Sequence, residues 1–334
     1  MINAARHKNV AIFVPHAGCP HQCAFCNQRH IAGTGRLPTA KDVTAACEAA
    51  LSTLPSDATA QIAFFGGSFT AIARDDMECL LKAAAPFVKS GAFDGIRVST
   101  RPDAVDDEVL HLLRSYGVTT VELGAQSMDD EVLIRCGRGH TAEQVRQAAA
   151  CIKNAGLALG LQMMTGLPGD TDEGALYTAR ELAALAPREV RVYPTLVMAD
   201  TPLETAYRQG LYRPQTVEEA IALCARLLTF FEEERGIPVI RLGLHAEDEM
   251  MRHCVAGPWH PAFREVCESR LFLQKAQRIL EKKTPPCTVT LRVHPTCMSR
   301  MVGHKRENLI RLQQEGFTVT VVADDTVKGR EVTT

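Results

Sequence analysis

The sequence predicts an α/β fold in three parts: a partial (β/α)6 barrel of the TIM type, a helical extension and a small C-terminal α+β appendage. Six short β-rich runs alternate with amphipathic helical runs, as in βα units that build a parallel sheet. Six units are too few for a complete eight-stranded barrel. A helical stretch follows, and the pair Pro285-Pro286 precedes a last αβ segment. We therefore expect the barrel in residues 1–215, the helical extension in 216–284 and the appendage in 285–334.

The six predicted strands are short runs enriched in β-branched and aromatic residues. They span residues 10–14, 61–65, 95–99, 119–123, 157–163 and 190–194. The helix predicted over 106–116 is typical of the connections, because its apolar residues fall on one side. On the fifth strand, Leu159 and Leu161 belong either to the core or to the wall of a ligand site.

An unusual polar or glycine-rich segment follows each predicted strand. These segments are 19–26, 66–69, 99–103, 124–127, 166–170 and 193–195. In parallel α/β barrels the C-terminal ends of the strands form the rim on which active sites are built. The sequence therefore predicts one active site assembled from six loops.

The first of these segments contains three closely spaced cysteines, Cys19, Cys23 and Cys26, with Phe25 directly before the last. Three thiolates can hold three irons of a [4Fe-4S] cluster and leave the fourth iron open to a ligand that is not protein. The alternative is a closed Cys3His zinc site completed by His30. The position of the cysteines at the rim favours the cluster, because a structural zinc site has no need of five further loops.

Composition places the chain among soluble globular proteins, with 46% hydrophobic and 23% charged residues in 334. No apolar run approaches the roughly 20 residues that span a membrane. The first ten residues contain no apolar signal-peptide core, so we expect a cytoplasmic protein. In that compartment the 12 cysteines are not expected to form disulfides.

The cysteine run after strand one, together with Gly66-Gly67 at the end of strand two, resembles the radical S-adenosylmethionine (SAM) superfamily. The resemblance implies a [4Fe-4S] cluster on Cys19, Cys23 and Cys26, with SAM chelated by the open iron. It also implies reductive cleavage of SAM to a 5′-deoxyadenosyl radical, with electrons from a donor such as flavodoxin or ferredoxin.

The same resemblance suggests which residues contact SAM. Phe25 would pack over the adenine, and Gly66 and Gly67 would let the backbone approach the methionyl amine. Ser99, Arg101 and Gln126 are candidates for hydrogen bonds to the ribose or the carboxylate. Each of these three residues could instead face the substrate.

Further motifs are similar to the radical SAM portion of the Elongator catalytic subunit. They are CPHQCAFCNQ, GGSFTA, STRPD, ELGAQS, GRGHT and YPTLV, in that order within residues 8–215. The similarity implies modification of the wobble uridine of tRNA. That family couples its chemistry to an acetyltransferase domain, for which we expect no room in this chain, so the particular reaction stays open. The GAQS and GLPG segments are also similar to oxygen-independent coproporphyrinogen oxidases, which implies a tetrapyrrole as the alternative substrate.

The appendage is predicted as strand 289–293, helices 295–301 and 307–314, and strand 317–323. This order is similar to the minimal KH unit, whose GXXG loop clamps a nucleic-acid backbone. Here the loop is Gly303, His304, Lys305 and Arg306, with arginine in place of the second glycine.

Charge supports the same interpretation of the appendage. Residues 270–334 contain twelve Lys/Arg and six Asp/Glu, a net charge of +6. The rest of the chain contains 25 Lys/Arg and 33 Asp/Glu, a net charge of −8. A basic end favours RNA as partner. The alternatives are a cap that merely packs on the barrel, and a non-catalytic RNA-binding protein whose cysteines hold zinc.

Overall fold

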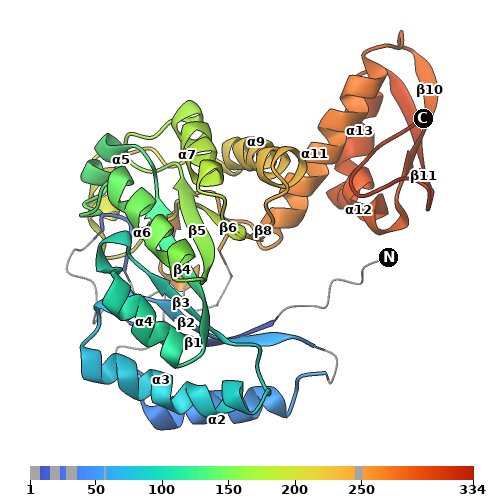
Figure 1. Ribbon diagram of the computed structural model, residues 1–334. Helices are drawn as coiled ribbons and strands as arrows, with labels where there is room; N and C mark the ends of the chain where they lie inside the picture. The colour runs from blue at the N-terminus through green and yellow to red at the C-terminus, as the bar shows by residue number, and fades with distance from the viewer. Residues whose placement is uncertain (1–7, 16–22, 28–35, 56–57, 245–250) are drawn as a thin grey trace.

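The computed structural model describes residues 8–15, 23–27, 36–55, 58–244 and 251–334. Within them, seven parallel strands form one curled sheet in the order β1-β2-β3-β4-β5-β6-β8. Helices cover its outer face, and a long helix leads to the appendage, which projects from the barrel (Figure 1). No helix of the described part is long and apolar enough to cross a membrane.

The strands of this sheet are β1 (Lys8–Val14), β2 (Ala60–Gly66), β3 (Ile96–Thr100), β4 (Val118–Gln126), β5 (Ala158–Thr165), β6 (Glu189–Pro194) and β8 (Val239–Leu242). The helices around it are α2 (Ala40–Leu51), α3 (Arg74–Lys89), α4 (Asp107–Ser115), α5 (Asp130–Arg135), α6 (Ala142–Asn154), α7 (Asp172–Ala184), α8 (Pro202–Arg208) and α9 (Val217–Leu228). A π-helical turn, η4 (Thr229–Glu234), continues α9, and β7 (Val197–Met198) pairs with β9 (Cys254–Ala256).

The predicted partial barrel is confirmed, and all six predicted strands are present. The seventh strand, β8, lies in the segment predicted as a helical extension, so that segment is not wholly helical. It pairs with β6 through an irregular register. Its four residues are too few to show a strand period beside the long α9–η4 helix. The boundary at residue 215 stays a prediction.

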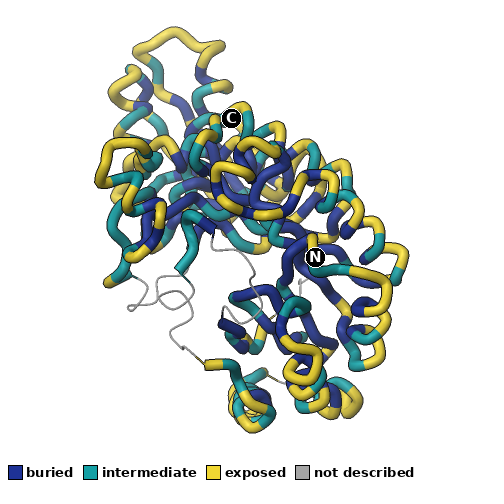
Figure 2. The backbone as a smooth tube through the Cα atoms, turned by 90° about the vertical axis from the view of Figure 1, so that its left-hand side faces the viewer, coloured by how far each residue is buried: buried dark blue, intermediate teal, exposed yellow. Residues whose placement is uncertain are grey.

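Successive strand residues face opposite sides of the sheet. The outer face is apolar: Ile62, Phe64, Leu159 and Leu161 are at most 2% exposed and belong to the core beneath the helices. Leu159 and Leu161 are therefore core residues. Figure 2 shows the same division, with buried backbone inside and exposed segments outside.

Local sequence sets where the outer helices begin. The side chains of Thr141 and Thr216 accept hydrogen bonds from the backbone N–H groups of Gln144 and Glu219, whose side chains bond back to the capping residues. Such capping boxes satisfy two otherwise unpaired N–H groups at the first turn. These capping boxes fix the start of α6, which precedes β5, and the start of α9, which precedes β8.

The appendage has the predicted order. Strands β10 (Cys287–Val293) and β11 (Phe317–Ala323) pair in parallel, and α12 (Met298–Val302) and α13 (Glu307–Gln314) connect them. These elements share a small apolar core with α11 (Phe263–Leu280), separate from that of the barrel. Asn308 joins the helices, because its buried amide donates to the carbonyl oxygens of Ser269 and Met301.

Part of the charge asymmetry is used inside the molecule. Six of the twelve basic residues in 270–334 form ion pairs: Arg270, Lys275, Arg292, Arg300, Arg311 and Arg330. Several of the partners, such as Glu218, Glu232 and Glu233, lie on the acidic α9–η4 helix. The net +6 therefore overstates the positive charge left for an external partner.

Candidate active site

The inner face of the curled sheet encloses a cavity of about 1290 Å³ to which all seven strands contribute. The described residues that were predicted to bind the cluster and SAM all line it. They are Cys23, Phe25, Cys26, Gly66, Gly67, Ser99, Arg101 and Gln126. Cys19 and His30 lie outside the described residues. The rim loops thus meet at one site, as parallel strands require, while the roles of the individual residues remain predictions.

The cysteine segment is held by one hydrogen bond within it and by two to the β4–α6 connection. The backbone N–H of Cys26 donates to the Cys23 carbonyl (3.0 Å), and the N–H of Ala24 donates to the Cys136 carbonyl (2.8 Å). Arg138 Nη1 donates to Cys23 Sγ at 3.4 Å. This contact places a positive guanidinium beside the sulfur of a predicted cluster ligand.

Two of the three predicted cluster ligands therefore share one edge of the cavity, beside a positive charge that suits an anionic iron–sulfur group. Within the described segments, no group of three His, Cys, Asp or Glu side chains could hold a metal ion.

An apolar patch adjoins the cysteines. Phe25 packs against a cluster that includes Val132, Met164 and Leu167, with Tyr193 at its margin. Phe25 and Met164 also line the cavity. A flat aromatic surface next to the predicted cluster is suited to a purine ring, so the predicted role of Phe25 fits its surroundings.

The structure shows a packing reason for glycine at position 67, beside its predicted role at the SAM amine, which stays a prediction. A Cβ on Gly67 would lie 2.8 Å from the carbonyl oxygen of Pro15, and the N–H of Gly67 donates to Val14. Glycine is therefore required by the close approach of β1, the strand that leads into the cysteine segment. Gly66, with φ of +104°, adopts a conformation that favours glycine.

A bulge at the end of β4 positions Gln126. The pairing of β4 with β5 shifts between Gly124 and Gln126, and Gln126 has φ of +67°. Its Oε1 accepts a hydrogen bond from Gln162 Nε2 at 3.2 Å. A Cβ on Gly124 would lie 2.8 Å from Arg138 Nη2 and from Gln126 Nε2, so glycine leaves the space that both side chains occupy. Bulges next to active sites commonly re-aim a side chain in this way.

Two buried arginines stand between the cysteines and the β3–β4 rim. Arg101 forms an ion pair with Asp103 and donates to the carbonyl of Arg138 (2.7 Å). Arg138, which was not predicted as a site residue, also donates to the carbonyl of Gly124. Arg101 Nη1 and Arg138 Nε are buried without an acceptor among the described residues. Buried donors normally have partners, so these atoms fit a ligand with acceptor oxygens, such as the carboxylate or ribose of SAM.

A chain of buried charges crosses the cavity wall below the rim. Glu122 accepts from Ser99 (3.2 Å) and pairs with Arg97 (3.4 Å) and with Arg191 (2.6 Å). Arg97 also pairs with Glu189. Ser99 is thus tied to the wall of the barrel, whereas Gln126 lies at its rim. The sequence carried a signal for this network, because its members occupy alternate strand positions.

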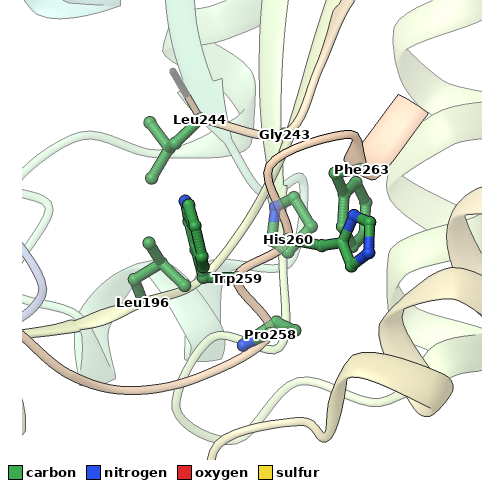
Figure 3. Close-up of a pocket in the computed structure, with 8 residues that line it drawn as sticks. Leu196, Gly243, Leu244, Pro258, Trp259, His260 and Phe263 are labelled. Carbon is green, nitrogen blue, oxygen red and sulfur yellow. The ribbon is translucent and has the colours of Figure 1, made fainter. Parts of the chain in front are cut away.

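A small void of about 10 Å³ adjoins the main cavity behind the end of β8. Figure 3 shows the Trp259 ring between Leu196 and Leu244, with His260 against Phe263. Leu196 and Leu244 line both spaces. Trp259 therefore supports the β6–β8 side of the cavity from behind.

One rim residue has a pH-dependent charge. Burial raises the pKa of Asp170, in the loop after β5, to about 7 from an ordinary value of 3.8. The folded state thus binds the Asp170 proton more tightly than the unfolded state does. The contribution of this tighter binding to folding stability is complete below pH 3.8 and is lost as the pH rises through about 7. Asp170 Oδ1 accepts from the N–H of Thr171, and asparagine can keep that bond.

We predict that Asp170→Asn stabilises the protein relative to wild type by more at pH 8 than at pH 5, with the gap between the two proteins wider by at least about 1 kcal/mol at pH 8. Urea unfolding of both proteins at the two pH values measures this difference. A gap between the proteins that does not change with pH would contradict the assignment.

Comparison with known proteins identifies the family. A sequence profile of the radical SAM superfamily matches residues 13–182, about half of the chain. The chain belongs to the radical SAM superfamily. A second profile, the radical SAM C-terminal domain, matches residues 187–272. The protein is therefore a radical SAM enzyme whose cofactors are a [4Fe-4S] cluster and SAM, and the non-catalytic zinc alternative is set aside.

Curated relatives include a "tRNA uridine(34) acetyltransferase" of Methanocaldococcus jannaschii, 34% identical over 129 residues, which are 38% of this chain and 24% of the relative. "Elongator complex protein 3" of Bos taurus is 29% identical over 180 residues, 53% of this chain and 32% of the relative. The matches thus span only a quarter to a third of these relatives.

Among solved structures, the archaeal Methanocaldococcus infernus Elp3 with an N-terminal deletion superposes with a TM-score of 0.62 at 20% identity. The match covers 83% of this chain and 63% of that one. Methylornithine synthase (PylB) superposes with a TM-score of 0.53 at 18% identity, covering 77% and 72%. At these identities the likeness concerns the fold.

Proposed function

We propose that this radical SAM enzyme modifies a base of RNA, with tRNA as the substrate. The observation that carries the proposal is the 34% identity to a protein named for tRNA uridine 34. When bound, the cluster and SAM would together supply the reducing electron and the radical chemistry needed to activate a C–H bond of the substrate.

The cysteine segment and the β1–β4 side of the cavity carry this proposal. Cys19, Cys23 and Cys26 hold the cluster, and Arg138 holds the Cys23 thiolate from the protein side. Phe25 covers the adenine at the apolar patch. The remaining predicted contacts to SAM come from Gly66, Gly67, Ser99, Arg101 and Gln126, which line the same cavity.

The appendage supplies the second support, through the loop Gly303–Arg306. His304, Lys305 and Arg306 are exposed, and Lys305 and Arg306 form no ion pair with any described residue. Arg306 has φ of +64°, so it adopts the left-handed conformation that glycine would favour at this position. Two unpaired cations on a tight turn are suited to phosphate contacts.

We predict that wild type binds tRNA at low salt and that Lys305→Ala/Arg306→Ala weakens this binding. The slope of log affinity against log salt should fall by about 2, one for each phosphate contact removed. The matched control is Lys282→Ala/Lys283→Ala, an exposed lysine pair elsewhere in the C-terminal region that forms no ion pair within the described part of the chain.

Binding at several salt concentrations, with mass spectrometry of nucleosides from cells with and without the gene, tests the proposal. A wild type that binds no tRNA at low salt, with unchanged nucleosides, rules out RNA as substrate. Equal losses in both double variants would show that the loop has no special role.

A further inference from the structure

The cavity has more room than SAM alone requires. Its volume of about 1290 Å³ exceeds the roughly 300–1,000 Å³ of a typical single-ligand pocket. The residues predicted to contact SAM come from the β1–β4 side of the cavity. The opposite wall, formed by β6 and β8, is therefore free to face a second molecule.

Charge is unbalanced on that wall. Arg191 and Arg241 are paired neighbours in the register of β6 and β8, and both line the cavity. Glu122 neutralises Arg191 from the other side, and Glu189 neutralises Arg97. Among the described residues, Arg241 has no carboxylate partner.

The surroundings of Arg241 also differ from those of Arg97 and Arg191, which have carboxylate partners. Its Nε donates to the carbonyl of Gly243 (3.1 Å), and it forms no ion pair with the described residues. Burial and the neighbouring Arg191 lower the pKa of Arg241. Its surroundings therefore disfavour the positive charge of the guanidinium. Charged groups taken out of water are normally paired, and an unpaired half-buried guanidinium facing a cavity therefore has the chemistry of an anion receptor.

Tyr193 adds a second donor on the same wall. Its hydroxyl accepts a hydrogen bond from Arg191 Nη1 (3.3 Å), which leaves its own O–H free to donate. Burial raises the pKa of Tyr193, so the hydroxyl keeps its proton at neutral pH. Arg191 is held in place by Glu122 and by the Phe65 ring, 4.7 Å below its guanidinium carbon. The receptor is therefore preorganised.

We propose that Arg241, with the hydroxyl of Tyr193, binds an oxyanion of the substrate on the β6–β8 wall, and that this oxyanion is the phosphate of the nucleotide whose base is modified. The nucleotide identity rests on the proposed function, whereas the anion site rests on the charge imbalance alone. Phosphate bound there would hold the nucleotide inside the barrel, with its base directed to the SAM side.

The test uses anaerobically reconstituted enzyme with SAM and isothermal titration calorimetry. The probes are uridine 5′-monophosphate and uridine, with inorganic phosphate and acetate as the two simple oxyanions. We expect wild type to bind the monophosphate at least tenfold more tightly than uridine. Arg241→Gln should remove this advantage and leave uridine binding within twofold, and Arg241→Lys should restore part of it.

The control is Arg188→Gln, because Arg188 is an exposed cation that lines the same cavity. Its monophosphate affinity should equal that of wild type. The proposal is overturned if wild type and Arg241→Gln bind the monophosphate equally well. It is also overturned if Arg188→Gln loses as much monophosphate affinity as Arg241→Gln. A third outcome is that acetate binds at the site as tightly as inorganic phosphate while the monophosphate binds no more tightly than uridine. That result would assign the site to a carboxylate and overturn the proposal of a phosphate.

These results are separable from the RNA proposal. If tRNA is neither bound nor modified but Arg241 still controls inorganic phosphate binding, the anion site stands and the RNA function fails. If tRNA is modified but Arg241→Gln leaves monophosphate binding unchanged, the RNA function stands and the anion site fails.

Discussion

Replacing Cys23 with serine should abolish SAM cleavage while leaving the protein folded. Cys23 is 4% exposed at the edge of the cavity and accepts a hydrogen bond from Arg138. Serine can accept the same bond and has nearly the same volume, so the fold should persist. It cannot replace a thiolate as an iron ligand, and two remaining cysteines do not hold a cubane cluster.

Three measurements check this prediction: iron and sulfide content after anaerobic reconstitution, 5′-deoxyadenosine formed from SAM under reductant, and thermal unfolding. The matched control is Cys79→Ser, because Cys79 is an exposed cysteine on the outer helix α3. The control should retain cluster and activity. Full SAM cleavage by Cys23→Ser would show that the cluster ligands are wrongly assigned.

The sequence was sufficient for the parts of the site that lie at strand ends. Strand runs, intervening helices and unusual segments define a rim, and the topology of a parallel sheet brings those segments together. For this reason Phe25, Gly66, Arg101 and Gln126 could be placed around one cavity before their contacts were known. Arg138 was missed because it follows α5 rather than a strand end.

The interior of the barrel was harder to predict. Arg97, Glu122 and Arg191 sit within strands whose other face is apolar, so they look like ordinary polar residues of half-buried strands. The alternation shows which side they share, but only the curvature of the sheet shows that this side encloses a cavity. The packing reason for glycine at position 67 could likewise not be predicted, because it depends on the distance between two strand ends.

Glu122→Gln should be the most destabilising single substitution in the cavity wall. The carboxylate of Glu122 is 3% exposed and contacts two guanidinium groups, those of Arg97 and Arg191. Glutamine preserves shape and the bond from Ser99 but removes the charge. Arg97 keeps Glu189. Arg191 would be left without a carboxylate among the described residues, beside Arg241, which has none there either.

Breaking a buried pair in this way typically costs about 3–5 kcal/mol, because the surviving charge remains desolvated. Urea unfolding at pH 7 measures the cost, and Glu78→Gln is the control. Glu78 also lies between two cations, Arg74 and Lys82, but on the exposed surface of α3, where solvent screens the interaction. The free energy of unfolding of the control should be close to that of wild type. If Glu122→Gln did the same, the cavity wall would be too well hydrated to hold an unpaired charge, and the argument for an anion site at Arg241 would lose its basis.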